Sequence, residues 1–191
     1  MVGNNPNFSK IDVLRCFLRL ERNLSRQTLS KELSLGEGTI RTILDILKSK
    51  GLLLSGKKGH SLSKKGVATI DSIKSHMSFP KETKFEQVYP GTAKMGFLLK
   101  DVRKLDNTHA LRDIAVRNGA DGALILKFDS ELHTPESGYR LDYKKLENEF
   151  MPKKGDCLVI SFAKDAKSAE QGAISIAIES KDELKSFINS F

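Results

Sequence analysis

The sequence predicts an α+β protein of two domains, and two observations support this class. Apolar residues recur mainly with helical spacing over residues 1–78, whereas short apolar runs typical of strands alternate with helical segments after residue 79. The charge divides at the same place. Through Ser78 there are 14 lysines and arginines against 6 aspartates and glutamates, and from Phe79 onward there are 18 of each. We therefore expect a basic domain over residues 1–78 and a neutral domain over residues 79–191.

The composition disfavours several classes of protein. No apolar run approaches the roughly 18 residues of a membrane helix, and the polar N-terminus lacks a signal core, so we expect a cytoplasmic protein with no membrane partner. Cys16 and Cys157 are far apart and form no CxxC pair, which indicates buried thiols in a reducing compartment. The four histidines are scattered, and P-loop, GxSxG and HExxH motifs are missing from the sequence. We expect no metal, no cofactor and no enzymatic activity.

Helical spacing and serine caps predict four helices in the first domain. Ser9 and Ser25 precede the first two helices, and Ser63 precedes the last. The third helix covers residues 37–50. Its apolar positions fall at i, i+3, i+4 and i+7 and form one buried stripe, namely Ile40, Ile43, Leu44 and Leu47. The last helix should carry Val67, Ile70 and Ile73 along one face.

A hairpin is predicted between the third and fourth helices. Two short apolar segments, residues 52–55 and 60–62, flank the loop Gly56-Lys57-Lys58-Gly59. The order is therefore helix, helix, turn, helix, two-stranded hairpin, helix. This is the order of a winged helix-turn-helix, with the basic loop at the tip of the wing.

Residues 35–44 (LGEGTIRTIL), with residues 51–53 and 62–66, resemble the winged helix-turn-helix superfamily. The resemblance covers about residues 8–78 and is strongest to the N-terminal half of archaeal winged-helix regulators whose C-terminal domain is uncharacterised. It implies that helix 37–50 is a recognition helix, that the start of the second helix meets a phosphate, and that the wing enters the minor groove or contacts its backbone. The residues that it implies for DNA binding are Ser25, Arg26, Thr39, Arg41, Thr42, Lys48, Lys57, Lys58 and His60.

Two observations oppose this interpretation. Glu37 and Asp45 lie on or near the recognition helix and would repel phosphate. Winged helices also serve as dimerisation or protein-contact modules.

The second domain is predicted to be a small α/β domain with a mixed sheet. Strands are expected over residues 95–102, 122–128 and 157–162, and a helix capped by Asn107 or Thr108 separates the first two, giving a β-α-β order. A charged segment over residues 141–150 is predicted to be helical. Residues 169–178 fit both a strand and a helix, and we favour the helix.

Ligands of open α/β sheets bind beyond the carboxyl ends of the strands. Two aspartates, Asp101 and Asp165, follow predicted strands, and the helix between the strands carries Arg112, Asp113 and Arg117. These five residues are the predicted ligand-binding set. The alternative is that they form ordinary surface ion pairs.

Together these patterns predict a transcription regulator that binds double-stranded operator DNA as a homodimer. The second domain would dimerise, sense a small-molecule effector, or do both. One alternative is a metabolic enzyme with an autoregulatory winged helix. Another is a nucleic-acid scaffold protein without a ligand.

Overall fold

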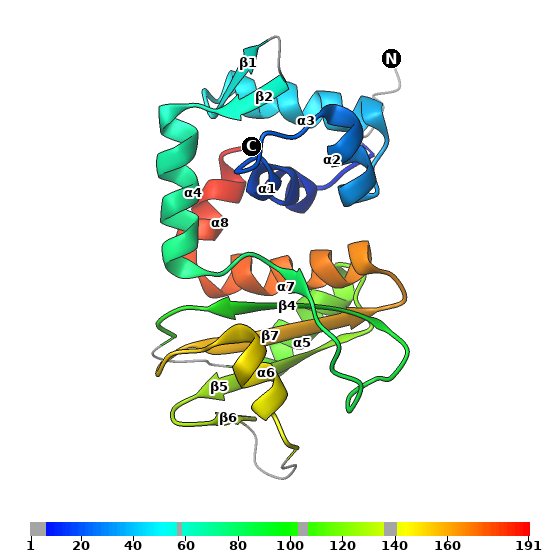
Figure 1. Cartoon of the computed structure of the whole chain (residues 1–191), viewed down its shortest axis with the longest axis vertical. Coiled ribbons are helices and arrows are strands. Elements are labelled where there is room, and N and C mark those ends of the chain that lie inside the picture. The colour runs from blue at the N-terminus through cyan, green and yellow to red at the C-terminus, as the bar shows by residue number, and fades with distance from the viewer. Residues whose placement is uncertain (1–6, 57–58, 103–106, 136–140) are drawn as a thin grey trace. The chain divides into compact units, whose positions relative to one another are not determined.

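The computed structural model describes residues 7–56, 59–102, 107–135 and 141–191, and the chain divides into two compact units. The first unit ends at Ile73 and also contains Ser186–Phe191, and the second is Lys74–Lys185 (Figure 1). The predicted class, α+β with two domains, is confirmed. The division falls a few residues before the expected boundary at residues 78/79, and the last six residues join the first unit rather than the second.

The first unit has the predicted order of elements. They are α1 (Lys10–Arg19), α2 (Arg26–Leu33), α3 (Glu37–Ser49), β1 (Leu53–Gly56), β2 (Gly59–Leu62) and most of α4 (Lys64–His76). The strands β1 and β2 form an antiparallel hairpin in which Leu53 faces Leu62 and Gly56 faces Gly59. Of the hairpin turn, Lys57 and Lys58 lie outside the described residues.

The three serine caps predicted for these helices are confirmed. The Ser9 Oγ accepts a hydrogen bond from the Asp12 amide at 3.3 Å, and the Asp12 carboxylate accepts one from the Ser9 amide at 3.0 Å, which completes a capping box. The Ser25 Oγ accepts from the Thr28 amide at 3.1 Å, and the Ser63 Oγ accepts from the Gly66 amide at 2.9 Å. These local hydrogen bonds fix where α1, α2 and α4 begin.

The core of the first unit contains an ion pair, and the apolar face of α4 is only partly buried in it. The Arg15 guanidinium is buried, donates to the Asp12 carboxylate at 2.8 Å and to the Leu33 carbonyl at 3.3 Å, and so is not part of the exposed positive surface. Along α4, Ile70 and Ile73 are buried as expected. Val67, one turn earlier on that face, is 48% exposed.

The second unit consists of a five-stranded sheet and its helices. In chain order the elements are β3 (Lys81–Glu82), β4 (Ala93–Leu99), α5 (Thr108–Arg117), β5 (Gly122–Phe128), β6 (Leu132–His133), α6 (Lys144–Phe150), β7 (Cys157–Ala163), α7 (Ala166–Ser180) and the start of α8 (Asp182–Asn189). The helical interpretation of residues 169–178 is confirmed by α7. The short strands β3 and β6 and the helix α8 were not predicted.

The pairing between strands corrects the predicted mixed sheet. The strand order is β3-β4-β7-β5-β6, and every described pair is antiparallel. The strands β4 and β5 do run in the same direction, as the β-α-β order requires. However, β7 is inserted between them, and Cys157 pairs with Leu99 on one side and Lys127 on the other. The two strands of the predicted parallel unit therefore never pair with each other.

Helices cover both faces of this sheet. The helices α5 and α7 pack on one face, and α6 packs on the other, where Leu146 and Phe150 join a cluster with Leu158 and Ile160 (Figure 1). All seven residues of β7 are buried because β7 is central and covered on both sides. Such a strand appears in the sequence as a continuous apolar run rather than an alternating one.

Among the described residues, the longest helices fall short of what a membrane crossing requires in length and apolar character.

Candidate nucleic-acid interface

The exposed side of α3 carries the residues that the sequence singles out. Because the apolar stripe of α3 is buried, Arg41, Thr42, Asp45 and Lys48 lie on the opposite, exposed side, and Thr39 is half-buried. The Thr42 hydroxyl donates to the Gly38 carbonyl at 3.2 Å, so its oxygen still has acceptor capacity. These five residues thus present two cations, one carboxylate and two hydroxyls, and Glu37 is a second exposed carboxylate at the start of α3.

The structure brings His60 of β2 together with charged residues of both α2 and α3. The pKa of His60 is lowered, first by partial burial and then by the positive charges of Arg26 and Lys48, while Asp45 opposes the shift. Charges shift a pKa appreciably only over short distances. Three of the predicted DNA-binding residues, from three different elements, therefore lie near one another with Asp45 among them. We call these three the Arg26–Lys48–His60 cluster.

Two contacts hold the hairpin and the His60 ring in place. The Ser55 hydroxyl and the His60 Nδ1 are 3.2 Å apart, across the β1–β2 pairing. Gly59 has a positive φ of 112°, and a Cβ built on it would lie 3.5 Å from the Asn23 Oδ1. The hairpin therefore packs against the connection between α1 and α2, which sequence spacing does not reveal.

Ser25 has a structural role at the start of α2. Besides capping Thr28, its Oγ lies 2.9 Å from the Thr28 hydroxyl, so both hydroxyls are engaged with each other. Both side chains lie at the surface of the first turn of α2, where Arg26 is also exposed. Ser25 thus positions the helix whose first residue belongs to the cluster.

The five residues of the predicted ligand-binding set do not come together. Asp101 follows β4 and Asp165 follows β7, and these strands are antiparallel, so the two aspartates lie at opposite ends of the sheet. Each strand has 7 residues. At a rise of about 3.4 Å per residue, the separation is on the order of 20 Å. The prediction assumed parallel neighbours, whose carboxyl ends would have met.

The remaining three residues of that set, Arg112, Asp113 and Arg117, all lie on α5. Arg117 ends α5, next to Gly119, whose Cβ position lies 3.8 Å from Ser168 of α7, so Arg117 belongs to the Asp165 end. Arg112 and Asp113 lie farther back along α5. Asp165 itself caps α7 by accepting from the Ser168 amide at 2.9 Å, and this hydrogen bond lowers the pKa of Asp165.

The described residues include no group of three or more potential metal ligands. Cys16 and Cys157 are free thiols and fully buried, and burial raises the pKa of each to about 12. Neither thiol is therefore a nucleophile near neutral pH.

Comparisons with known proteins divide the chain in a similar way. Residues 11–68 match the family described as PH0730-like, N-terminal domain, and residues 89–180 match a domain of unknown function, DUF4443. No curated protein matches the chain. Among solved structures, the chain is similar to a hypothetical protein, PH0730, from Pyrococcus horikoshii OT3. The identity is 27%, the TM-score is 0.77, and the match covers 94% of this chain and 99% of the other. The chain is thus similar, over nearly its whole length, to a two-domain archaeal protein.

Proposed function

We propose that the first unit binds double-stranded DNA and that the protein regulates transcription. The observation that supports this most is the Arg26–Lys48–His60 cluster, because α2, α3 and the hairpin each contribute one of its members. In a winged helix-turn-helix these are the three elements that approach the duplex. The α3 helix would be the recognition helix, and β1–β2 would be the wing.

The positive charge of the first unit suits a polyanion. Arg41 and Lys48 are exposed on α3, and Arg26 is exposed at the start of α2. Lysine and arginine contacts to phosphates release condensed counterions and supply most of the sequence-independent affinity. Burial contributes most to the lowered pKa of His60, Arg26 and Lys48 lower it further, and Asp45 acts in the opposite direction.

Asp45 has a role that follows from its place inside this cluster. A carboxylate among phosphate-binding cations weakens non-specific binding, yet it can accept a hydrogen bond from the N4 amino group of cytosine in the major groove. We therefore assign Asp45 to base discrimination. The Asp45→Asn variant should bind arbitrary duplexes more tightly and discriminate less between sequences.

The test is fluorescence anisotropy of a labelled duplex of mixed sequence, titrated with the full-length protein over a series of salt concentrations. Arg41→Ala and Lys48→Ala should each weaken binding and reduce the slope of log affinity against log salt by about 1. The matched control is Lys10→Ala, which removes the same charge from the exposed start of α1.

Lys10→Ala should leave both affinity and slope nearly unchanged. Binding that ignores salt would overturn the proposal. Equal losses in Lys10→Ala and Arg41→Ala would do the same, since they would reflect net charge and not this surface.

A further inference from the structure

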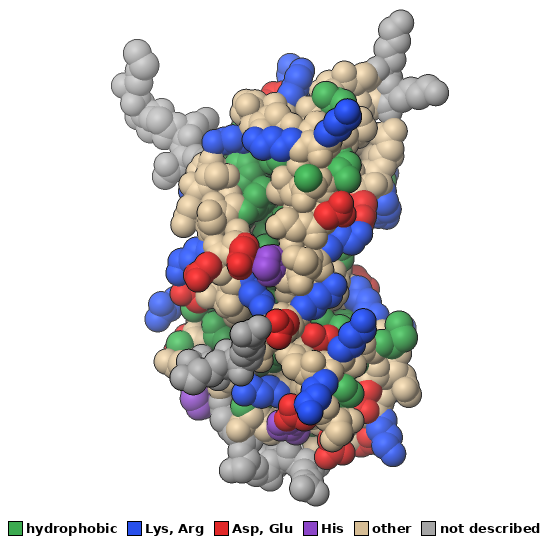
Figure 2. Space-filling view, turned by 90° about the vertical axis from the view of Figure 1, so that its left-hand side faces the viewer, with side chains coloured by type: hydrophobic (Ala, Val, Ile, Leu, Met, Phe, Trp, Pro, Cys, Tyr) green, Lys and Arg blue, Asp and Glu red, His purple; other side chains and the backbone are tan. Residues whose placement is uncertain are grey.

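The first unit contains a hollow whose function is not explained by DNA binding. Its volume is about 220 Å³, and it lies between the connection from α1 to α2, strand β2 and helix α4. It is lined by Leu20, Glu21, Asn23, Ser61, Leu62, Val67, Ile70 and Asp71. Hydrophobic side chains are visible in hollowed parts of the surface in the upper part of the molecule (Figure 2).

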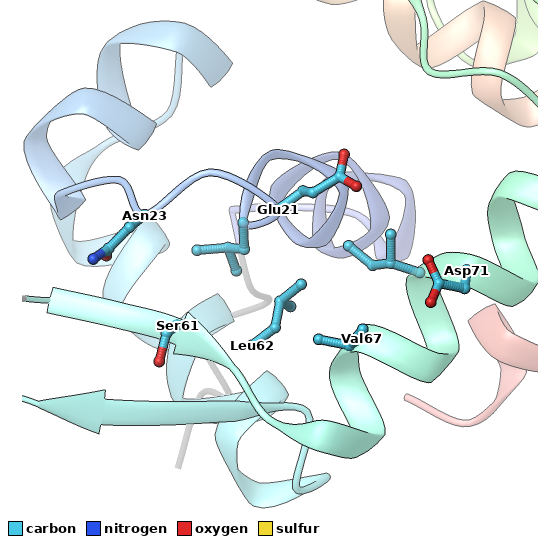
Figure 3. A pocket seen from close by; sticks show the side chains of 8 residues that line it. Glu21, Asn23, Ser61, Leu62, Val67 and Asp71 are labelled. Carbon is cyan, nitrogen blue, oxygen red and sulfur yellow. The ribbon is translucent and has the colours of Figure 1, made fainter.

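The floor of the hollow is apolar. Leu20 and Ile70 are almost completely buried beneath it, and the Leu62 and Val67 side chains point into the open space (Figure 3). Val67 is 48% exposed although it follows the buried-face spacing of α4. Val67 therefore leaves an apolar side chain open to the hollow.

The rim of the hollow is acidic on one side. The carboxylates of Glu21, after α1, and Asp71, on α4, both lie on the side of the hollow away from Asn23 and Ser61 (Figure 3). None of the eight described lining residues is a lysine, arginine or histidine. Both charged side chains of this lining are therefore acidic, in a unit that has an excess of positive charge.

We propose that this hollow binds a small amphipathic cation, namely a primary amine on a compact apolar body. The body would cover Leu62 and Val67, and the ammonium group would lie between Glu21 and Asp71. The carboxylates would repel an anion. A hydrated metal ion or a polyamine would have to place charge against the apolar floor without a partner, which is costly.

The size of the hollow narrows the ligand further. Pockets for drug-sized ligands have volumes of roughly 300–1,000 Å³, so a hollow of about 220 Å³ suits a single ring or a short branched chain. Leu62 is also the last residue of β2, so the ligand would touch the hairpin of the proposed DNA surface. This places an effector site in the first unit and not in the second, where the sequence predicted it.

The experiment titrates 2-phenylethylamine into the full-length protein and follows backbone amide signals by nitrogen-15 NMR. We expect saturable shifts centred on Leu62, Val67 and Asp71. Two probes separate the parts of the ligand: 3-phenylpropionate keeps the ring but reverses the charge, and ethylamine keeps the amine but lacks the ring. Both should bind at least tenfold more weakly.

Variants locate the site. Asp71→Asn should weaken binding about threefold, as expected for one exposed charge pair, and Asp71→Asn with Glu21→Gln should weaken it about tenfold. Val67→Phe should fill the hollow and abolish binding while the amide spectrum stays that of a folded protein. The matched control, Glu37→Gln, removes an exposed carboxylate at the start of α3, outside the hollow, and should bind like the wild type.

Equal binding of 3-phenylpropionate and 2-phenylethylamine would overturn the proposal. Unchanged binding to a folded Val67→Phe variant, or an equal loss in Glu37→Gln and Asp71→Asn, would do the same. None of these measurements uses DNA, so a failure here is distinct from a failure of the proposed DNA binding.

Discussion

The ring of Phe187 stacks on the ring of Phe17, with the centroids 5.4 Å apart and the planes inclined by 25°. Phe17 is completely buried in the core of the first unit. Phe187 also meets Phe191 edge to face, at 4.9 Å and 78°. The end of the chain thus completes a hydrophobic core that begins with α1, so a fragment that ends near residue 78 lacks part of its own core.

The first prediction concerns this stacked pair. Phe187→Ala should lower the free energy of unfolding of the first unit by about 1–3 kcal/mol, below the roughly 3–5 kcal/mol of a fully buried phenylalanine, because Phe187 is only half-buried. Chemical denaturation of the full chain measures it. Asn189→Ala, exposed on the same helix, is the control, and an equal loss in both variants would show that the stacking is not the cause.

The second prediction concerns pH and His60. Because the pKa of His60 in the folded protein lies below its ordinary value of about 6.5, the unfolded chain takes up a proton first as the pH falls. Stability should therefore decrease as the pH drops through that value toward the lowered folded-state pKa. His60→Gln should flatten this part of a plot of unfolding midpoint against pH, whereas His109→Gln, exposed on α5, should not.

DNA binding should respond to pH in the opposite direction. A phosphate beside His60 favours the protonated ring, so its pKa rises in the complex and binding takes up a proton. Affinity should then increase as the pH falls toward 6, and His60→Gln should abolish the increase. An affinity that is flat over this range in the wild type would place His60 away from the phosphates.

The third prediction compares two helical glycines. A Cβ on Gly172 would lie 2.6 Å from the Ala120 Cβ and 2.7 Å from the Ser161 Oγ, where α7 packs closely on α5 and the sheet. Gly172→Ala should therefore destabilise the second unit by about 1–3 kcal/mol. Gly38 in α3 has nothing within 4 Å of its Cβ position, so Gly38→Ala should stabilise the first unit by up to about 1 kcal/mol. Thermal unfolding measures both effects. Equal changes in the unfolding temperature of the two variants would contradict the close packing at Gly172.

The fourth prediction concerns the two thiols. Cys16 and Cys157 are fully buried, and burial raises the pKa of each to about 12, so neither should react with iodoacetamide at mildly alkaline pH while the protein is folded. Both should react in concentrated guanidinium, as intact-mass spectrometry would show. Ser49→Cys places a thiol on the exposed end of α3 as a positive control. Rapid labelling of a native thiol would mean that its unit opens readily.

The sequence predicts the first unit well because local interactions determine its elements. Ser9, Ser25 and Ser63 bond to amides three residues away, and the buried stripe of α3 follows directly from helical spacing. The neighbours of His60 were less predictable. Arg26 and Lys48 lie near His60 only because the fold brings α2 and α3 close to the hairpin, and residue spacing in the sequence does not predict such contacts.

The second unit was predicted less completely because its strand order is non-local. The strands themselves were found, since β4, β5 and β7 are apolar runs. Nothing in a run of seven buried residues tells which neighbours it pairs with, and β7 lies between two strands that precede it in the chain. The ligand set failed for this reason, because Asp101 and Asp165 would be close only if β7 ran parallel to β4.

The insertion of β7 also has a consequence for folding during synthesis. The central strand is the last strand to leave the ribosome, so β4 and β5 emerge with no partner that can join them and expose their inner edges until residues 157–163 follow. The first unit must wait even longer, for Phe187 to reach Phe17. The second and first units therefore complete their folding only after residues 157–163 and Phe187, respectively, have emerged, and a nascent chain that stalls or is truncated before residue 157 exposes the unpaired strand edges that promote aggregation.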